Sequence, residues 1–205
     1  MTEIFENPNS IMKRPLIFVI SAPSGTGKST VADRLEMDLK NLLKRARSCT
    51  TRTIRHGEVE GRDYYFIDEE RFRALIDSSS FLEYEELFGA CYGILKSEVE
   101  GILASGNHVL LVLDVKGALK FRNLFPSSVV TIFLLPPSPE EQLKRLSKRG
   151  SENSDSLHER LSRTVEEERM SDFFDYKVIN QDLNATAFIL KSIFIAEEHR
   201  RRDHE

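Results

Sequence analysis

The sequence predicts an α/β fold in which helices cover a parallel sheet. Two observations support this prediction. First, Leu16 to Ser21 is an apolar run without polar alternation, which is typical of a strand buried on both faces. Second, strand candidates alternate with helix candidates along most of the chain, which is typical of a doubly wound parallel sheet.

The individual elements follow from hydrophobic spacing. Apolar residues at helical spacing predict a helix over Lys28 to Arg45, directly after the first strand. Ser138, with Glu141 three residues later, forms a capping box that opens a late helix, and a second charged helix ends near Met170. The remaining predicted strands are 64–67, 81–87, 108–113, 129–135 and 176–179, and the remaining helices are 68–76, 96–104, 117–124 and 184–198.

We expect one domain over residues 15–200, between a flexible arm at 1–14 and a charged tail at 201–205. Residues 47–96 are polar and aromatic and residues 139–170 are strongly charged, so that both segments interrupt the α/β pattern. We interpret these two segments as insertions. The core around them is predicted at 15–46, 97–138 and 171–200.

The composition predicts a soluble, cytoplasmic protein. Hydrophobic residues make up 40% of the chain and charged residues 30%, with a formal net charge of −4. The acidic balance argues against a protein that wraps nucleic acid, and no apolar stretch approaches the roughly 20 residues of a membrane span. The first residues lack a signal pattern, and Cys49 and Cys91 form neither a CxxC pair nor a disulfide framework. We therefore expect reduced thiols, no nucleic-acid partner and no membrane partner.

The stretch SAPSGTGKST, residues 21–30, predicts a phosphate-binding loop between the first strand and the first helix. It matches the P-loop pattern with Ala22 in place of the first glycine. Glycines let backbone N–H groups turn onto phosphate oxygens, and the helix N-terminus adds its dipole. Lys28 would reach the β- and γ-phosphates of a nucleoside triphosphate, and the Ser29 hydroxyl would bind Mg²⁺. The predicted ATP-binding residues of this loop are Ser24, Gly25, Thr26, Gly27, Lys28, Ser29 and Thr30.

Asp114 follows an apolar strand, at the edge of the sheet where ligands bind in such folds. An aspartate in this place is either the N-cap of the next helix or a magnesium ligand. Because a P-loop precedes it in the chain, we favour the second interpretation. The predicted metal ligands are therefore Ser29 and Asp114.

Residues 48–64 predict a second anion site. Arg52 and Arg55 lie close together in a loop rich in hydroxyl groups, and Tyr64 follows after a turn with two glycines. Two guanidinium groups with several hydroxyls suit a tetrahedral phosphate dianion. Taken alone, the stretch also fits a solvated charged loop. The P-loop favours the phosphate site.

Five segments, in this order and spacing, resemble guanylate kinase. The likeness covers nearly the whole chain, from about Lys13 to Arg200. It implies a P-loop kinase fold with a GMP-binding insertion at 47–96 and a helical lid at 139–170. It also implies phosphorylation of GMP, and of dGMP, by ATP with Mg²⁺, in purine nucleotide metabolism. The five segments are SAPSGTGKST, SCTTRTIRHGEVEGRDYYF, FLEYEELFGACYG, LLVLD and LLPPSPEEQLKRLSKRG.

The resemblance also implies roles for single residues. It places Glu83 at the guanine edge, where a carboxylate accepts from N1–H and the 2-amino group and discriminates against adenine. It places Arg145 and Asn180 near ATP. The implied contacts to the GMP phosphate are Ser48, Arg52, Arg55, Tyr64 and Tyr92. The implied catalytic residues are Lys28, Arg55, Arg149 and Arg160, with Arg163 in the same cluster.

The chain departs from the family pattern at three places. Ile94 replaces a Ser or Thr whose hydroxyl would donate to guanine O6, Val112 replaces the first of two strand aspartates, and Ala90-Cys91 replaces Asn-Tyr. These changes weaken the argument for guanine and leave the phosphate chemistry untouched. Two alternatives stay open, a P-loop kinase of another small phosphate such as a ribose bisphosphate, and a non-catalytic guanylate-kinase-like protein-binding module. Monomer and homodimer stay open as well.

Overall fold

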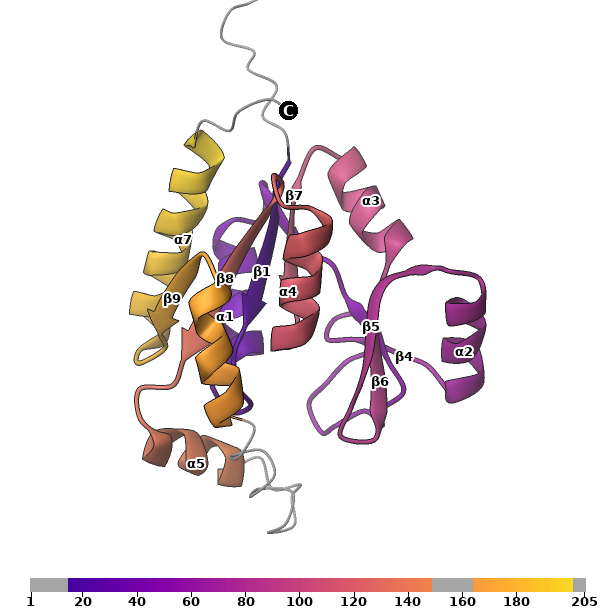
Figure 1. The fold of residues 1–205 in the computed structure, drawn as a ribbon, viewed down its shortest axis with the longest axis horizontal. Helices are drawn as coiled ribbons and strands as arrows, with labels where there is room; N and C mark the ends of the chain where they lie inside the picture. The colour runs from indigo at the N-terminus through magenta and orange to yellow at the C-terminus, as the bar shows by residue number, and fades with distance from the viewer. Residues whose placement is uncertain (1–14, 149–163, 201–205) are drawn as a thin grey trace, which may run out of the picture.

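The computed structural model describes residues 15–148 and 164–200. The predicted arm and tail lie outside these ranges, as does the part of the predicted lid at 149–163. The described chain forms a five-stranded sheet flanked by helices and a smaller four-stranded sheet beside it (Figure 1). The predicted fold class is confirmed.

The larger sheet is parallel throughout, in the order β2–β7–β1–β8–β9. β1 lies at its centre between β7 and β8, and all of its residues are buried. This position explains why the first strand is a continuous apolar run. The strands are β1 (Ile17–Ser21), β2 (Leu43–Arg45), β7 (His108–Val112), β8 (Val129–Leu135) and β9 (Tyr176–Ile179).

Helices cover both faces of the larger sheet (Figure 1). Side chains alternate between the faces along β1, so that Phe18 and Ile20 enter one core while Ile17 and Val19 enter the other. The first core is closed by α1 and α7, and the second by α3 and α4. These helices are α1 (Lys28–Asp38), α3 (Lys96–Ala104), α4 (Val115–Leu124) and α7 (Leu183–His199).

The smaller sheet has the order β4–β3–β6–β5 and lies to one side of the larger sheet (Figure 1). It packs against a single helix through a third core, in which the rings of Phe72 and Phe81 lie 4.6 Å apart. Its elements are β3 (Ser48–Thr50), β4 (Tyr65–Phe66), α2 (Glu69–Asp77), β5 (Phe81–Leu87) and β6 (Ala90–Leu95).

The described part of 139–170 is helical. α5 (Pro139–Lys148) begins after Ser138, whose hydroxyl accepts from the backbone N–H of Glu141 at 3.3 Å, as expected from the capping pattern. Residues 164–170 form a further helix, which leads into a 3₁₀ turn, η1 (Ser171–Phe173). Among the described residues, no helix combines the length and the apolar character that a membrane crossing requires.

The predicted helix over Lys28 to Arg45 is too long. α1 ends at Asp38, and a turn follows. Leu43 then begins β2 and pairs with His108 of β7. The apolar spacing continues past the helix because Leu43 is fully buried as a strand residue rather than as a helix residue. β3 and β6 also lie outside the predicted strands. They are three and six residues long and show no regular alternation of buried and exposed positions.

Candidate active site

The loop between β1 and α1 has the conformation that phosphate binding requires. Gly25 and Gly27 adopt φ values of 82° and 94°, which glycine tolerates at low cost. Gly27 is the N-cap of α1, and no side chain of the described residues caps this helix. The first-turn N–H groups, including those of Ser29 and the exposed Thr30, are therefore left for a ligand. The Lys28 ammonium donates to the carbonyl of Ala22 at the end of β1.

Three side chains from later in the chain donate hydrogen bonds to backbone carbonyls of this loop. The Asn180 amide donates to the Thr26 carbonyl at 2.6 Å, and the Arg145 guanidinium donates to the same carbonyl at 3.3 Å. The buried Gln142 amide donates to the Ser24 carbonyl at 2.8 Å. Arg145 and Asn180, both expected near ATP, thus contact the backbone of the phosphate-binding loop.

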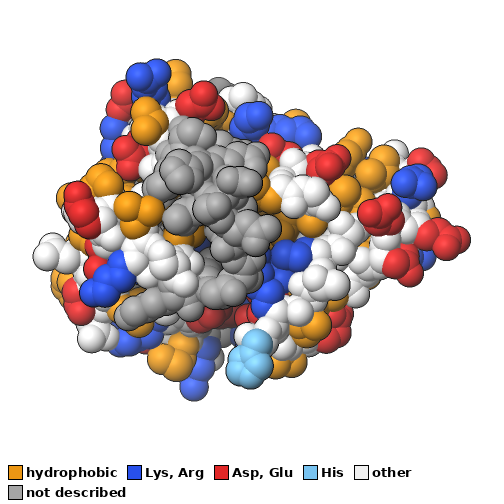
Figure 2. Space-filling view, turned by 90° about the horizontal axis from the view of Figure 1, so that it is seen from below, with side chains coloured by type: hydrophobic (Ala, Val, Ile, Leu, Met, Phe, Trp, Pro, Cys, Tyr) orange, Lys and Arg blue, Asp and Glu red, His pale blue; other side chains and the backbone are white. Residues whose placement is uncertain are grey.

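One cleft joins the loop to the smaller sheet. In the view from below, Lys and Arg side chains gather between the larger part of the molecule and the smaller lobe (Figure 2). Eleven of the predicted site residues line the cleft, from both sides of it: Ser24, Gly25, Gly27, Lys28, Ser29, Ser48, Arg55, Tyr64, Glu83, Tyr92 and Asp114. A donor phosphate on the loop and an acceptor on the smaller sheet would therefore share one space.

The register of the smaller sheet explains why its residues face the cleft together. Ser48 pairs with Ile94, and Ile94 pairs with Glu83, across three adjacent strands. Directly opposed residues of antiparallel strands project from the same face. Tyr92 and Glu85 form the next row on this face, and all five residues line the cleft. Where the family pattern has the hydroxyl of a Ser or Thr, this chain therefore has the fully buried side chain of Ile94.

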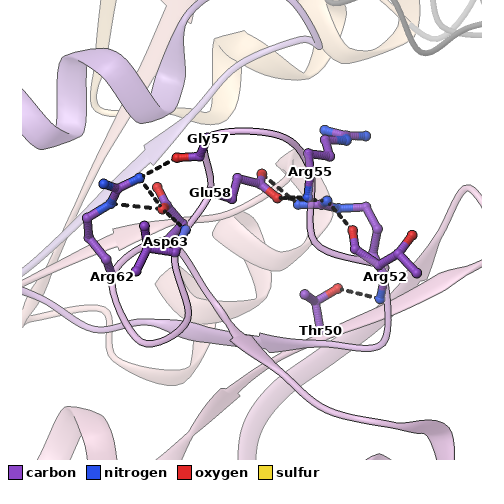
Figure 3. A network of polar contacts seen from close by, with 9 residues as sticks. Thr50, Arg52, Arg55, Gly57, Glu58, Arg62 and Asp63 are labelled. Carbon is purple, nitrogen blue, oxygen red and sulfur yellow. Dashed lines mark hydrogen bonds and ion pairs between the residues drawn. The ribbon is translucent and has the colours of Figure 1, made fainter.

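The two predicted arginines of the acceptor side differ in their surroundings. Arg55 is exposed and lines the cleft, and within the described residues its guanidinium has no hydrogen-bond or ion-pair partner. Arg52 lies behind the cleft lining, where its Nη1 and Nη2 donate to both oxygens of Glu58 at 3.0 and 2.9 Å (Figure 3). Its guanidinium carbon lies 5.4 Å from the ring centre of Tyr64. Only one of the two guanidinium groups therefore faces the cleft directly.

Two tyrosines complete the acceptor side. The rings of Tyr64 and Tyr92 meet edge to face with centres 6.0 Å apart, and both line the cleft. Burial raises the pKa of Tyr64, and the neighbouring Tyr92 raises it further. The Tyr64 hydroxyl therefore stays protonated at neutral pH and can donate a hydrogen bond to a phosphate oxygen.

Glu83 is a buried residue of the cleft lining. It is only 6% exposed, and within the described residues it forms no hydrogen bond. Burial raises the pKa of Glu83 to about 7, and the nearby Asp114 adds to this effect while Lys120 opposes it. A buried, unpartnered carboxylate in a cleft is costly, and a ligand with two adjacent donors would satisfy it.

Asp114 is the N-cap of α4, because its Oδ1 accepts from the backbone N–H of Gly117 at 2.8 Å. The cap interpretation is thus shown, and the metal role stays a prediction. Burial raises the pKa of Glu85 to about 7, and the neighbouring Asp114 carboxyl contributes to this shift.

The chemistry of the cleft fits a magnesium–nucleotide complex. Mg²⁺ keeps several waters and takes one or two protein oxygens together with phosphate oxygens. Ser29 and Asp114 offer two such oxygens on the same cleft. Within the described ranges, no group of three or more His, Cys, Asp or Glu side chains forms an all-protein metal cage. The predicted lid residues Arg149, Arg160 and Arg163 lie outside the described residues.

Comparison with known proteins identifies the family. The family model for guanylate kinase matches residues 12–197. The chain belongs to the guanylate kinase family. A guanylate kinase of Chlamydia pneumoniae is 46% identical over 186 residues, which are 91% of this chain and 90% of the relative. A guanylate kinase of Bartonella quintana is 38% identical over 190 residues, which are 93% of this chain and 85% of the relative.

A solved guanylate kinase also matches in three dimensions. The crystal structure of guanylate kinase from Anaplasma phagocytophilum has a TM-score of 0.77 and 34% sequence identity, and the match covers 92% of this chain and 88% of that one. The resemblance seen in the five sequence segments is confirmed.

Three residues of this guanylate kinase site have no place in the sequence-based prediction. Glu85 follows Glu83 by two positions, so that strand periodicity alone would have placed it on the same face. Glu58, which pairs with Arg52, and Gln142, which holds the loop, carry no local signal in the sequence. Their partners become visible only in the folded chain.

Proposed function

We propose that this chain transfers the γ-phosphoryl group of ATP to GMP, and also to dGMP, in the cytoplasm. The observation that carries the proposal is the single cleft that joins a P-loop to an acceptor side with Arg55, two tyrosines and a buried carboxylate. Membership of the guanylate kinase family supports the same reaction. We expect only small-molecule substrates, and a monomer or a homodimer.

The reaction is a direct in-line displacement. An oxygen of the GMP phosphate attacks the γ-phosphorus, the bond to the β,γ-bridging oxygen breaks, and ADP leaves. The acceptor oxygen is already anionic at neutral pH, so that no general base is needed. Lys28 and the predicted Arg55, Arg149 and Arg160 stabilise the charge that spreads over the transferred group. Ser29 and Asp114 would hold Mg²⁺, which neutralises the β- and γ-phosphates of the donor.

The acceptor side provides recognition of phosphate and base. Ser48, Tyr64 and Tyr92, which line the cleft, would donate to the GMP phosphate beside the two arginines. The Glu83 carboxylate would accept from N1–H and the 2-amino group of guanine, and adenine lacks this donor pair. The buried Ile94 offers no donor to guanine O6, which is the observation that favours the second candidate, a kinase of another small phosphate.

Steady-state assays that detect ADP release test the proposal. With ATP and Mg²⁺, we expect rapid turnover of GMP and dGMP and little turnover of AMP, UMP or ribose 1,5-bisphosphate. Rapid phosphorylation of ribose bisphosphate without GMP turnover would establish the second candidate. Absence of turnover with every acceptor, together with binding of peptides, would favour the protein-binding module.

A further inference from the structure

The Glu58 carboxylate lies at the centre of a polar network behind the acceptor side of the cleft (Figure 3). Its two oxygens accept from Nη1 and Nη2 of Arg52 at 3.0 and 2.9 Å, and Oε2 also accepts from the backbone N–H of Arg55 at 2.8 Å. One carboxylate thus holds the side chain of one predicted phosphate-binding arginine and the backbone of the other.

The donors of Arg52 can be counted one by one, because a guanidinium has five N–H groups. The two on Nη1 are used by Glu58 and by the carbonyl of Thr53 at 2.7 Å. One on Nη2 is used by Glu58. The remaining two, on Nε and Nη2, form the side-on fork of the guanidinium. The Nε atom is buried and has no hydrogen-bond partner among the described residues.

The surroundings of Arg52 hold its guanidinium directly behind the cleft lining, beside Tyr64. The guanidinium lies 5.4 Å from the ring centre of Tyr64 and 5.6 Å from that of Phe66, which limits its rotation. Tyr92, a residue of the cleft lining, also lies beside this guanidinium. A side-on fork binds two oxygens of one phosphate, as it does two oxygens of one carboxylate.

Glu58 also shapes the loop that carries Arg55. The bond from the Arg55 N–H to the Glu58 carboxylate, three residues later, closes a turn over residues 55–58. The Arg55 side chain points away from Glu58, so that its guanidinium is left for the cleft (Figure 3). Burial alone would raise the pKa of Glu58, but the hydrogen bonds from Arg52 and from the Arg55 backbone outweigh it and lower this pKa. Glu58 therefore stays charged at neutral pH.

From these contacts we infer that Glu58 is a positioning residue for the acceptor phosphate. Glu58 accepts from Nη1 and Nη2 of Arg52, which form the end-on pair of donors, and from the backbone N–H of Arg55. The side-on pair of Arg52, on Nε and Nη2, and the whole guanidinium of Arg55 are then left to bind the phosphate. The inference rests on the proposed function, because it assumes that the acceptor is a phosphate monoester. It predicts a specific loss of phosphate binding when the charge of Glu58 is removed.

The opposite role for Glu58 is a competing counter-ion that the phosphate must displace from Arg52. The two roles predict opposite changes in GMP affinity when the charge of Glu58 is removed. Removing a competitor would tighten GMP binding, whereas removing a positioning group would weaken it. The donor count favours positioning, because two N–H groups of Arg52 stay available while Glu58 is bound.

The test compares Glu58→Gln with Asp63→Asn, a matched control in the same loop. Asp63 accepts from the Arg62 guanidinium at 2.9 Å and from the backbone N–H of Val59 at 2.8 Å, the same pair of contacts without an acceptor arginine. Calorimetry measures the affinity of each protein for GMP and for guanosine. For Glu58→Gln we expect GMP affinity to fall roughly 10- to 50-fold. Guanosine affinity and the KM for ATP should stay unchanged, and Asp63→Asn should match the wild type in GMP affinity.

Each other result overturns the inference. Unchanged or tighter GMP binding by Glu58→Gln would show that Glu58 does not position Arg52, or that it competes with the phosphate. An equal loss of GMP and guanosine binding would show a merely structural role, as would an equal loss of GMP affinity in Asp63→Asn. If the wild-type protein binds no GMP, the proposed function itself fails. Wild-type binding without a Glu58 effect removes only the inference.

Discussion

The Glu83 carboxylate lowers the stability of the free protein and can contribute to the binding of guanine. The residue is 6% exposed and its carboxylate lies near Asp114, and burial raises its pKa to about 7. A group with a raised folded-state pKa contributes stability that is present below its unfolded pKa and is lost as the pH rises through its folded pKa. Above pH 7 the free protein therefore carries a destabilising charge, which guanine donors would offset.

Glu83→Gln should accordingly stabilise the free protein and impair its activity. From the pKa of about 7 against the ordinary 4.5, we expect an increase in the unfolding free energy of about 1–3 kcal/mol at pH 8. The gain should shrink below pH 7 and vanish well below pH 4.5, where Glu83 is neutral in both states. Urea denaturation at several pH values measures the gain, and the exposed Glu86→Gln on the same strand is the control.

The same substitution should raise the KM for GMP at pH 8, because an amide presents one acceptor where the carboxylate presents two. In the wild type, the KM for GMP should rise as the pH falls below 7, where Glu83 takes up a proton. A Glu83→Gln protein that is less stable at pH 8, with an unchanged KM for GMP, would show that Glu83 is a structural residue.

At the scale of elements, α5 supports the phosphate-binding loop. Gln142 is 1% exposed and donates to both the Ser24 carbonyl and the Thr164 hydroxyl. Leu146 packs so closely on Gly25 that an added Cβ there would lie 2.7 Å from its side chain. The loop conformation is therefore coupled to the packing of α5.

We expect Gln142→Leu to raise the KM for ATP several-fold and to leave the KM for GMP unchanged. The substitution keeps the side-chain volume but removes the hydrogen bonds to the Ser24 carbonyl and the Thr164 hydroxyl, at a cost of about 1–3 kcal/mol in unfolding free energy. Ser147→Ala removes an exposed hydrogen bond on the same helix and should match the wild type in both measurements. An unchanged KM for ATP in Gln142→Leu would show that α5 does not support the loop.

The elements also show how far the sequence can predict this fold. α3, β5, β8 and β9 have the predicted bounds, because each of these segments ends at a clear break in the sequence. The short β2 and β3 depend on partners distant in the chain, so that local spacing cannot reveal them. β6 forms a hairpin with the preceding β5, but its residues show no regular alternation of buried and exposed positions. The P-loop can be predicted from the sequence because its phosphate-binding residues are consecutive in the chain. The pairing of Arg52 with Glu58 and the burial of Glu83 depend on the folded smaller sheet, and no local pattern predicts them.

At the scale of the molecule, the central claim is that two phosphate sites face each other across one cleft. The P-loop belongs to the larger sheet, and the acceptor residues belong to the smaller sheet. Both sheets rest on α3 and α4, because Ile94 of β6 packs in the same core as Val99 and Ala118. Movement of the smaller sheet on this contact would change the distance between the two phosphate sites.

The most direct test of this claim is inhibition by adenosine and guanosine joined 5′ to 5′ through a chain of phosphates. The arrangement predicts that this compound competes with ATP and also with GMP, because it would fill both sites at once. It should bind more tightly than either mononucleotide, since the second site is engaged intramolecularly. Competition with only one substrate, and a non-competitive pattern against the other, would contradict the shared cleft.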